Sequence, residues 1–359
     1  MRILAVAGAS GGHIYPASSF LSAVKIKIKS AETLLVLPLR CIAKNIIFKD
    51  SGVKYIRTTQ LSLRPTFGNF LSGIKYLEGV AQSFELLLRF KPDIVVGFGS
   101  IDSIPLVTLA WLFRVKTMIH EQNVVPGRAN RFLAKLVDRI AVTFAQTEKS
   151  FNVNPAKIVL TGNPVRNDLT RIDRIQALKF FGFKEKFTIL VMGGSQGSGR
   201  INKYFFEAVK SSSDLQVIHI CGANNDAQLK RGYKEIKVEA RVVPFLEEMR
   251  YAYSAADLVV CRAGATTIAE LSYFASPAII IPYPYAYAHQ LENARILGNS
   301  GAAVIIQDND LESGILKEKI RRCSQRNVLD NMRLNYGSLD SPAAAELLAD
   351  AALLAAENG

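Results

Sequence analysis

Two glycine-rich stretches contain residue types that could bind a phosphate group. The first, residues 8–13, reads Gly-Ala-Ser-Gly-Gly-His and follows an apolar run at 3–7. Small residues let the backbone approach a ligand, and a helix that we expect from about Pro16 would present its N-terminal N–H groups to an anion. His13 adds a side chain that exchanges protons near neutral pH, and packing hardly explains a histidine in a loop of small residues, so we favour a functional role over a structural one.

The second stretch, residues 193–199, reads Gly-Gly-Ser-Gln-Gly-Ser-Gly and follows an apolar run at 187–192. Ser195 and Gln196 add side-chain donors to a helix N-terminus, so diphosphate binding is favoured over a structural turn. No Gly-Lys-Ser/Thr follows, which excludes a Walker loop. A redox NAD site is disfavoured because no acidic residue closes the second apolar run, which ends in Leu-Pro-Leu-Arg at 37–40.

Further polar residues follow two later apolar runs. In the stretch 261–270, Cys-Arg-Ala-Gly-Ala-Thr-Thr-Ile-Ala-Glu, a helix would carry Glu270 one to two turns from its start. The Glu270 carboxylate could accept hydrogen bonds from a ribose diol there, and the alternative is a solvated helix acid. Three polar side chains beyond it suit the hydroxyl groups of a sugar: His289, Gln290 and Asn293.

One stretch has the spacing of a metal-binding motif. Residues 308–310 read Asp-Asn-Asp, as in metal-dependent transferases. The same residues also look like a helix start, with Asn309 as N-cap and Glu312 three residues later, and we favour this capping role. We therefore expect neither a bound metal nor another cofactor.

Thirteen apolar runs are spaced through the chain with helical stretches between them. Many are continuous Val/Ile/Leu runs, which is typical of parallel strands covered on both faces. The alternation predicts an α/β protein with two Rossmann-like, doubly wound parallel-sheet domains that face a cleft, with ligands at the carboxyl ends of the strands. The expected strands are 3–7, 33–37, 53–57, 93–97, 115–119, 139–143, 157–160, 187–192, 216–220, 238–243, 257–261, 278–282 and 302–306.

The length of 359 residues is natural for two domains. Gly162, followed by Asn-Pro, breaks the last strand of the first half, so we place one domain at 1–162 and the other at 163–340. A Ser-Pro pair at the start of 341–359 supplies an N-cap and a first helical residue. This last helix is expected to pack back toward the N-terminal domain.

The charge of the chain is unevenly distributed. Residues 1–162 contain 21 Lys or Arg and 9 Asp or Glu, whereas residues 163–359 contain 23 and 22. A basic N-terminal half indicates a nucleic acid, an anionic membrane or a phosphorylated substrate as partner, and the alternative is a surface that is merely soluble. The Lys and Arg residues are scattered with no aromatic-interleaved stripe, which argues against nucleic acid.

Two segments of the basic half suit a membrane surface. The longest apolar run, 104–113, is too short to span a bilayer, and the chain reads Trp-Leu-Phe-Arg-Val-Lys at 111–116. Residues 61–77 place apolar side chains at helical spacing, with Arg64 and Lys75 nearby. Apolar surface rimmed by cations fits an anionic lipid surface, and helices that face the core are the equal alternative.

The chain start and the cysteines indicate a cytoplasmic environment. The apolar run that begins at Ile3 is expected to be a strand, so we expect no signal peptide. The widely spaced cysteines form no Cys-x-x-Cys motif, which favours reduced thiols over a zinc site or a disulfide framework. They are Cys41, Cys221, Cys261 and Cys323.

Six short motifs occur in order along the chain. They are Gly-Gly-His-x-x-Pro at 11–16, His-Glu-Gln-Asn at 120–123, Gly-Asn-Pro-Val-Arg at 162–166, Gly-Gly-Ser-Gln-Gly at 193–197, Gly-Ala-Thr-Thr-Ile-Ala-Glu at 264–270 and His-Gln-Leu-Glu-Asn-Ala at 289–294. Over nearly its whole length the sequence therefore resembles the MurG family of bacterial glycosyltransferases. This family transfers N-acetylglucosamine (GlcNAc) to undecaprenyl-diphosphate-MurNAc-pentapeptide, the lipid I of peptidoglycan synthesis.

The resemblance implies a GT-B fold that binds the donor UDP-GlcNAc mainly through the C-terminal domain. By motif match, Phe245 faces the uracil with its backbone and Glu270 binds the ribose. Ser195 and Arg166 meet the diphosphate. The other implied donor contacts are Ser10, Gly11, Gly12, Asn123, Ala265, Thr266, Thr267, Ile268, Ala269 and Gln290.

The resemblance also implies an inverting reaction, because the donor bond is α and the product bond is β. One displacement needs a base on the C4 hydroxyl of MurNAc, which we assign to His13, and electrostatic stabilisation of the leaving UDP in place of a metal. The family is peripheral to the cytoplasmic face of the plasma membrane, the bacterial inner membrane. An anionic membrane surface and contacts with other cell-wall synthesis proteins are implied in turn.

Two loops depart from the family pattern. The usual Gly-Gly-Thr-Gly-Gly-His reads Gly-Ala-Ser-Gly-Gly-His at 8–13, which keeps a hydroxyl and a small residue. A Gly-Tyr-Gly-Gly-Tyr loop reads Gly-Phe-Gly-Ser-Ile at 97–101, so one glycine and two phenol groups that bear on acceptor diphosphate binding are missing. The acceptor-side candidates are Gly97, Gly99, Ser100 and His120.

Three other functions stay open. A glycosyltransferase that makes glycolipids from diacylglycerol would share the fold, the basic face and most donor motifs. A UDP-GlcNAc 2-epimerase would also use two Rossmann-like domains but would need no lipid surface. A basic nucleic-acid-binding module is the non-enzymatic alternative, and we favour it least.

Overall fold

A computed structural model describes residues 1–41, 51–58, 67–194, 197–212, 214–223, 226–284, 289–337 and 343–357, with the backbone alone for 67–74. The chain folds into two units. The first comprises Met1–Arg166 together with Pro342–Gly359, and the second comprises Asn167–Ser341. The division therefore falls at the end of the Gly-Asn-Pro-Val-Arg motif, and the C-terminal segment belongs to the first unit.

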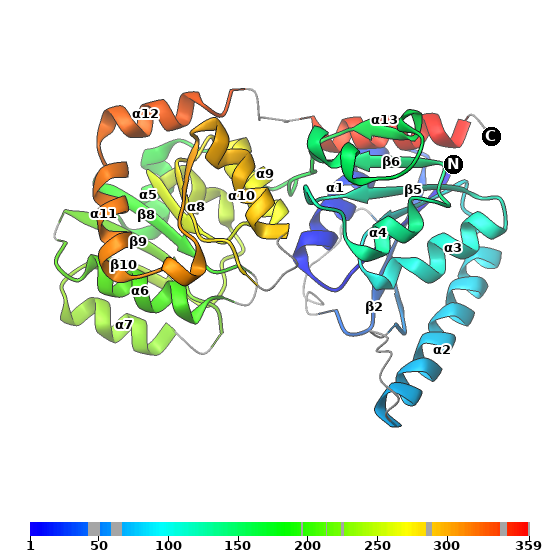
Figure 1. Cartoon of the computed structure of the whole chain (residues 1–359), viewed down its shortest axis with the longest axis horizontal. Coiled ribbons are helices and arrows are strands. Elements are labelled where there is room, and N and C mark those ends of the chain that lie inside the picture. Colours follow the sequence, from blue (N-terminus) through cyan, green and yellow to red (C-terminus); the bar gives the residue numbers. More distant parts are fainter. Residues whose placement is uncertain are drawn as a thin grey trace. The chain divides into compact units, whose positions relative to one another are not determined.

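The first unit contains a seven-stranded parallel sheet in the order β3-β2-β1-β4-β5-β6-β7 (Figure 1). Its central strands are rich in Val, Ile and Leu because both faces of the sheet are covered. Along β1, Ile3 and Ala5 face one core, while Leu4 and Val6 face the other. The strands are β1 (Arg2–Ala7), β2 (Glu32–Pro38), β3 (Gly52–Ile56), β4 (Ile94–Phe98), β5 (Lys116–Glu121), β6 (Arg139–Val142) and β7 (Ile158–Leu160).

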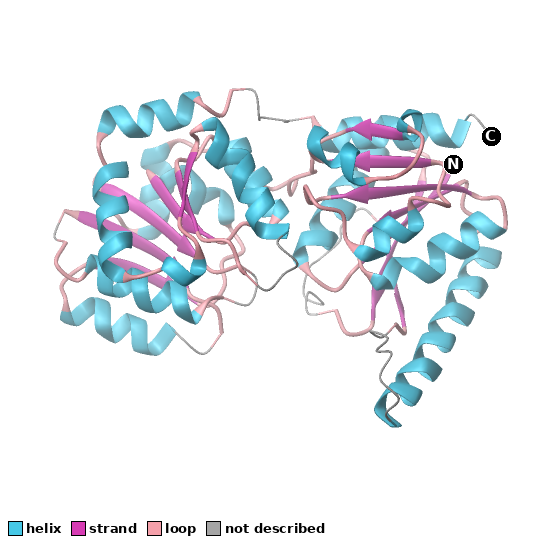
Figure 2. Ribbon diagram, viewed as in Figure 1, coloured by secondary structure: helices cyan, strands magenta, loops and turns pink. Residues whose placement is uncertain are grey.

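Helices cover both faces of this sheet (Figure 2). The helices α1 and α13 pack against one another on the face of Ile3, so the C-terminal helix completes a core begun by the first strand. The helices α2, α3 and α4 cover the face of Leu4. The helices are α1 (Gly11–Lys27), α2 (Phe67–Phe90), α3 (Ile104–Leu112), α4 (Arg128–Leu133) and α13 (Ala344–Glu357), with 3₁₀ turns η1 (Ile101–Ser103), η2 (Ala145–Ser150) and η3 (Pro155–Lys157).

The second unit contains a six-stranded parallel sheet in the order β10-β9-β8-β11-β12-β13. The helices α6 and α11 pack together, as do α5 and α8. Its strands are β8 (Phe187–Met192), β9 (Leu215–Ile220), β10 (Glu239–Val243), β11 (Leu258–Cys261), β12 (Ala278–Ile280) and β13 (Ala303–Ile305). Its helices are α5 (Arg174–Phe181), α6 (Gly199–Val209), α7 (Asp226–Glu235), α8 (Met249–Ala255), α9 (Ala265–Phe274), α10 (His289–Ser300), α11 (Ser313–Cys323) and α12 (Arg326–Leu334), with the 3₁₀ turn η4 (Asp308–Asp310).

The two parallel sheets confirm the predicted fold class, and each expected strand lies within two residues of its predicted ends. The start of the first helix differs. Helix α1 begins at Gly11 rather than near Pro16, because the carbonyl of Ser10 accepts the N–H groups of His13 and Ile14 at 3.0 and 3.1 Å. Pro16 is tolerated inside the helix because it removes only one intrahelical bond close to the helix start.

The capping role expected for Asn309 is wrong. Helix α11 begins at Ser313 with Glu312 at its N-cap position, and residues 308–310 form the turn η4. The Ser-Pro pair at 341–342 and the residues 61–66 with Arg64 lie outside the described part of the chain. The four cysteines are buried thiols.

Candidate active site

Two glycines make room for His13 at the carboxyl ends of β1 and β4. A Cβ atom on Gly8 would lie 2.9 Å from Nδ1 of His13, and one on Gly99 would lie 3.4 Å from Nε2. Gly99 also has a φ of +75°, which favours glycine. The imidazole therefore occupies a slot that side chains at these two positions would fill.

The slot keeps the imidazole of His13 neutral at physiological pH. The hydroxyl of Ser10 lies 3.1 Å from Nδ1, which is a hydrogen bond. Burial lowers the pKa of His13 below its ordinary value of 6.5, and the nearby Asp102 opposes part of this effect. A neutral imidazole can take up a proton, as a general base must.

Asp102 is a site residue that our sequence analysis did not single out. Its carboxylate accepts two hydrogen bonds from Arg40 at 2.7 Å, one from the hydroxyl of Ser100 at 2.7 Å and one from the hydroxyl of Thr58. The available signal was an acidic residue directly after the strand end and glycine loop at 97–101. A lone acid in a turn is usually solvated, so the signal was weak.

The acceptor-side candidates in this loop have different roles. Gly97 lies within β4, where a Cβ would come 2.9 Å from the side chain of Val107 in α3, so this glycine allows helix packing. Ser100 has a positive φ of +69° and is the N-cap residue of the turn η1. Gly99 and Ser100 lie beside His13 and Gly8, and their contact with an acceptor stays a prediction.

His120 supports the site from inside the core, which departs from the acceptor-side role expected for it. The side chain is fully buried, with Nε2 2.9 Å from the carbonyl of Gly162 and Nδ1 3.1 Å from Nε2 of Gln122. Burial lowers the pKa of His120 to about 4. A neutral ring that donates from Nε2 and accepts at Nδ1 satisfies both contacts.

Glu121 holds the loop after β5. One carboxylate oxygen accepts the backbone N–H and the side-chain amide of Asn123 at 2.9 and 3.1 Å. The other accepts the N–H of Gly127 at 3.0 Å and the amide of Asn130 at 2.8 Å. Asn123 is therefore fixed in place, while its expected contact with GlcNAc stays a prediction.

The other donor candidates of the first unit lie near the start of α1. Gly11 is the first residue of the helix, and Ser10 and Gly12 are exposed. The Arg166 guanidinium lies 4.6 Å from the centre of the Tyr15 ring, a cation–π contact that orients it within this unit. Its contact with a diphosphate stays a prediction.

The glycine-rich loop of the second unit passes close to the end of β9. A Cβ on Gly197 would lie 2.5 Å from the carbonyl of Cys221, and φ at Gly197 is +74°, so only glycine fits. Ser198 caps α6, with its hydroxyl accepting the N–H of Ile201 at 3.4 Å. Ser195 and Gln196 lie outside the described residues.

Glu270 is a buried carboxylate in α9, 9% exposed, rather than a solvated helix acid. The hydroxyl of Tyr253 in α8 donates to its Oε2 at 2.8 Å. Burial, followed by the charge of Glu270, raises the pKa of Tyr253 far above its ordinary range, so the phenol stays a donor. Tyr253 is a second residue that our sequence analysis missed.

The start of α9 places the remaining donor candidates. Gly264 is the N-cap, Ala265 and Ile268 are buried, and the partly exposed residues that follow the N-cap are Thr266, Thr267 and Ala269. Phe245, in the segment after β10, is 62% exposed, as a residue that faces a ligand through its backbone can be.

Two polar residues of α10 hold the loops around the start of α9. Oε1 of Gln290 accepts the N–H groups of Ala263 and Tyr283 at 3.2 and 2.9 Å. Asn293 is fully buried and donates to the carbonyl of Ala263 at 3.1 Å, so it packs the loop and does not face a sugar. Gln290 is in position to present its amide nitrogen beside the loop.

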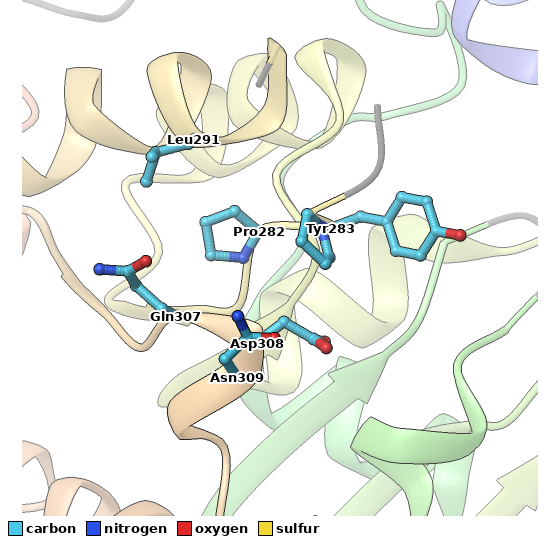
Figure 3. Close-up of a pocket in the computed structure, with 7 residues that line it drawn as sticks. Pro282, Tyr283, Leu291, Gln307, Asp308 and Asn309 are labelled. Atoms are coloured by element: carbon cyan, nitrogen blue, oxygen red, sulfur yellow. The ribbon is translucent and has the colours of Figure 1, made fainter. Parts of the chain in front are cut away.

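Asp308, the first residue of the Asp-Asn-Asp stretch, is paired with two arginines. Its Oδ1 lies 2.6 Å from Nη1 of Arg262, and its Oδ2 lies 3.0 Å from Nε of Arg200. Asp308 lines a small pocket (Figure 3) together with Pro282, Tyr283, Pro284, Leu291, Gln307 and Asn309. Within the described segments, no three His, Cys, Asp or Glu side chains are grouped so that they could hold a metal ion.

Two doubly wound parallel-sheet units with glycine-rich loops at their strand ends are the architecture of the GT-B fold. The glycosyltransferase family 28 N-terminal domain matches residues 3–142, and the C-terminal domain of the same family matches residues 188–346. The chain is therefore a glycosyltransferase.

Relatives narrow the class to one family. A UDP-N-acetylglucosamine–N-acetylmuramyl-(pentapeptide) pyrophosphoryl-undecaprenol N-acetylglucosamine transferase from Bacillus licheniformis is 37% identical over 97% of this chain and 97% of its own. The crystal structure of Acinetobacter baumannii MurG has a TM-score of 0.76, with 24% identity over 99% of this chain and 100% of that one. The chain belongs to the MurG family.

The same fold also occurs in an enzyme of another class. The crystal structure of a UDP-GlcNAc 2-epimerase from Neisseria meningitidis, bound to UDP-GlcNAc, has a TM-score of 0.71 with 13% identity over 99% of this chain and 100% of that one. Fold similarity alone thus does not separate the transferase from the epimerase, and the sequence relatives do.

Proposed function

We propose that this protein transfers GlcNAc from UDP-GlcNAc to the C4 hydroxyl of MurNAc in undecaprenyl-diphosphate-MurNAc-pentapeptide, with inversion at the anomeric carbon. The family membership supports the reaction. The observation that carries the mechanism is the placement of His13, a neutral imidazole in a slot between Gly8 and Gly99 at the carboxyl ends of two strands.

In the proposed step, Nε2 or Nδ1 of His13 takes the proton of the acceptor C4 hydroxyl. The C4 oxygen forms a bond to the anomeric carbon of GlcNAc, and the bond from that carbon to the β-phosphate oxygen of UDP breaks. The electron pair of the broken bond leaves with UDP. One displacement of this kind converts the α-linked donor into a β-linked product.

The second unit is proposed to bind the donor. Glu270 accepts hydrogen bonds from the ribose, and the N-termini of α6 and α9 offer N–H groups to phosphate oxygens. The family resemblance adds two proposed diphosphate contacts, Ser195 of this unit and Arg166 of the first unit. The leaving UDP is then stabilised electrostatically without a metal, in agreement with the engagement of both Asp308 oxygens by arginines.

A face formed by α2 and α3 supports binding to an anionic membrane. The rings of Phe84 and Phe113 lie 5.5 Å apart and join the two helices. Lys91 and Arg114 are exposed directly after α2 and α3. The exposed apolar side chains of this lipid face are Leu77, Phe84, Leu88, Trp111, Leu112 and Phe113.

We infer that the lipid face rests on the cytoplasmic face of the plasma membrane, where a lipid-linked acceptor would be found. Aromatic and apolar side chains flanked by cations bind such a surface through burial and charge together. No helix in the described part of the chain is long and apolar enough to cross a bilayer. Contacts with other cell-wall synthesis proteins rest on the family resemblance alone.

Transfer assays with radiolabelled UDP-GlcNAc test the reaction. His13→Ala should lower kcat by about 10²–10⁴-fold, the usual contribution of a general base, while UDP binding measured by calorimetry is retained. Glu270→Ala should weaken UDP binding instead. Turnover is expected to be unchanged in EDTA, because no step is assigned to a metal.

The choice of acceptor separates the alternatives. Lipid I should be glycosylated, and diacylglycerol should not be. Release of UDP with 2-epimerised sugar and no acceptor product would assign the chain to epimerase chemistry. Full turnover by His13→Ala would show that His13 is structural and would remove the proposed base.

A further inference from the structure

The loop after β4 holds a serine in a backbone conformation that glycine adopts readily and other residues do not. Ser100 has φ +69° and ψ 155°. Such strain persists only where the surroundings hold the residue in place. The Ser100 hydroxyl donates to Oδ2 of Asp102 at 2.7 Å, and the Ser100 carbonyl accepts the hydroxyl of Ser103 at 2.8 Å. Asp102 therefore helps to pin the strained turn.

Asp102 is also the centre of a polar cluster that joins three strand ends. Its side chain is 1% exposed. Arg40 follows β2 and donates to both carboxylate oxygens at 2.7 Å, and Thr58 follows β3 and donates its hydroxyl to Oδ1. A buried carboxylate needs such donors because an unpaired charge in the core is costly. The cluster ties the segments after β2, β3 and β4 to one another.

The pinned turn forms one wall of the His13 slot. A Cβ on Gly8 would lie 2.5 Å from Cβ of Ser100 and 2.9 Å from Nδ1 of His13, so the two side chains flank the same glycine. Gly99, the neighbour of Ser100, lies against the other edge of the imidazole. A shift of residues 99–102 would move the surface against which the ring rests.

We propose that Asp102 is a positioning residue for the candidate base His13. Through Ser100 it holds the turn against which the imidazole packs, and its negative charge favours the imidazolium that forms when His13 takes up the acceptor proton. The inference rests on the proposed function, because it requires His13 to act as the base. None of the six motifs that identify the family contains Asp102 or Arg40.

The charges around the pair give the direction of the expected effect. His13 is faced by Asp102 from the loop after β4 and by His120 from β5. Asp102 is faced by Arg40 from the segment after β2 and by the hydroxyl of Tyr76 from α2. Burial lowers the pKa of His13 and Asp102 opposes this. Loss of the Asp102 charge should lower that pKa further, and loss of Arg40, the counter-ion, should raise it.

The test is the pH dependence of kcat/KM for the lipid-linked acceptor in two variants of the full chain. A base acts in its unprotonated form, so activity rises with pH through the pKa of the base. Asp102→Asn should move this rising limb to lower pH and reduce the plateau by roughly threefold to tenfold. Arg40→Gln should move the limb to higher pH. A substitution that only loosens the local packing should lower the plateau of kcat/KM without shifting the rising limb in opposite directions in the two variants.

Two further variants complete the test: a matched control, and a variant that removes only the hydrogen bond from Ser100 to Asp102. Asp257 forms an ion pair of 2.7 Å with Arg174 in the second unit. Asp257→Asn breaks this pair and should leave the rising limb at its wild-type pH. Ser100→Ala removes the hydroxyl link alone, so it should lower the plateau with the limb in its wild-type place. Thermal unfolding identifies any variant that does not fold. If Asp102→Asn does not fold, the shift of the rising limb in Arg40→Gln decides the test.

The outcomes separate this inference from the proposed function. Inactive His13→Ala together with an unmoved limb in Asp102→Asn or Arg40→Gln overturns the positioning role and leaves the reaction in place. Fully active His13→Ala removes His13 as the base and with it the positioning role of Asp102, while the transfer reaction itself stands. Opposite limb movements in the two variants support the positioning role.

Discussion

Buried carboxylates hold the candidate site residues of both units in place. Asp102, Glu121, Glu270 and Asp308 are each at most 9% exposed, and each accepts hydrogen bonds from side chains of a neighbouring segment. An ionised carboxylate in the core without such donors would destabilise the fold by several kcal/mol. Each of the four therefore fixes one of the segments that surround the strand ends. Removing the side chains that donate to them should change substrate binding or the turnover rate.

The hydrogen bond from Tyr253 to Glu270 should contribute to donor binding. The Tyr253 ring stacks on Phe274 with 4.9 Å between ring centres, so Tyr253→Phe keeps the packing and removes the hydroxyl that donates to Oε2 of Glu270 at 2.8 Å. We expect KM for UDP-GlcNAc to rise about tenfold, or ~1.4 kcal/mol, the size of one hydrogen bond to a charged group. Steady-state kinetics should show kcat little changed.

Tyr336→Phe is the matched control for this prediction. Tyr336 is a second buried phenol of the same unit, and its hydroxyl donates to the carbonyl of Ser276 at 2.6 Å. Its loss should lower the Tm of the unit and leave KM for the donor unchanged. Equal changes of KM in both variants would mean that general loosening, and not the position of Glu270, controls donor binding.

The strands could be predicted from the sequence, whereas the side-chain pairs that hold distant loop segments together could not. A continuous apolar run such as 187–192 identifies β8, because a strand covered on both faces must be apolar throughout. The glycines and His13 could be found because their residue types are unusual in one short stretch. Arg40 and Asp102 are 62 residues apart, and no local periodicity reports that they meet. The same holds for Arg262 and Asp308, 46 residues apart.

Helices α2 and α3 show a second feature that the sequence alone could not predict, namely which of their faces is buried. Their apolar residues fit a core or a lipid surface equally well in the sequence, because helical spacing does not tell which face has a partner. The structure buries Gly79, Ser83 and Leu87 of α2 and exposes Leu77 and Leu88. The core therefore uses one side of the helix, and the other side stays exposed with apolar residues on it.

Charged substitutions on the lipid face should weaken membrane binding. Trp111 is 43% and Leu112 62% exposed, so replacing both by Glu disturbs little packing while adding negative charge. Binding to vesicles that contain phosphatidylglycerol should fall by at least about tenfold, because apolar burial is lost and anionic lipid repels the new charges. Sedimentation of the protein with vesicles at low and high salt measures this.

Leu334→Glu provides the comparison. Leu334 is 77% exposed on α12 of the second unit, outside the lipid face. Its replacement should leave vesicle binding at the wild-type level. Undiminished binding of the Trp111/Leu112 variant would place the membrane contact elsewhere on the chain.

The two units of the chain share a feature that links stability to pH. Each has a fully buried histidine in its central sheet, His120 in β5 and His219 in β9. Nδ1 of His219 lies 2.9 Å from the hydroxyl of Tyr233, and Nε2 lies 3.1 Å from Oδ1 of Asn202, an arrangement for a neutral ring. Burial lowers the pKa of His219 to about 3 and that of His120 to about 4.

Acidification should therefore destabilise both units well above the pH at which the carboxylates are protonated. An unfolded histidine binds a proton near pH 6.5, whereas these two stay neutral in the fold until about pH 4 and pH 3. As the pH falls below 6.5, the unfolded chain binds more protons than the native one. The free energy of unfolding should thus fall by about 1.4 kcal/mol per pH unit for each histidine.

Urea unfolding between pH 7.5 and pH 4.5 measures this slope, and two variants assign it. His219→Asn removes the titrating ring and should reduce the slope of the second unit, even though the variant is less stable at pH 7. Tyr233→Phe breaks the hydrogen bond of 2.9 Å to the same ring but keeps the titration, so it should be less stable with the wild-type slope or a steeper one. Identical slopes in His219→Asn and the wild type would mean that other groups carry the pH dependence. Because His120 belongs to the first unit, a residual slope in His219→Asn is expected from that unit alone.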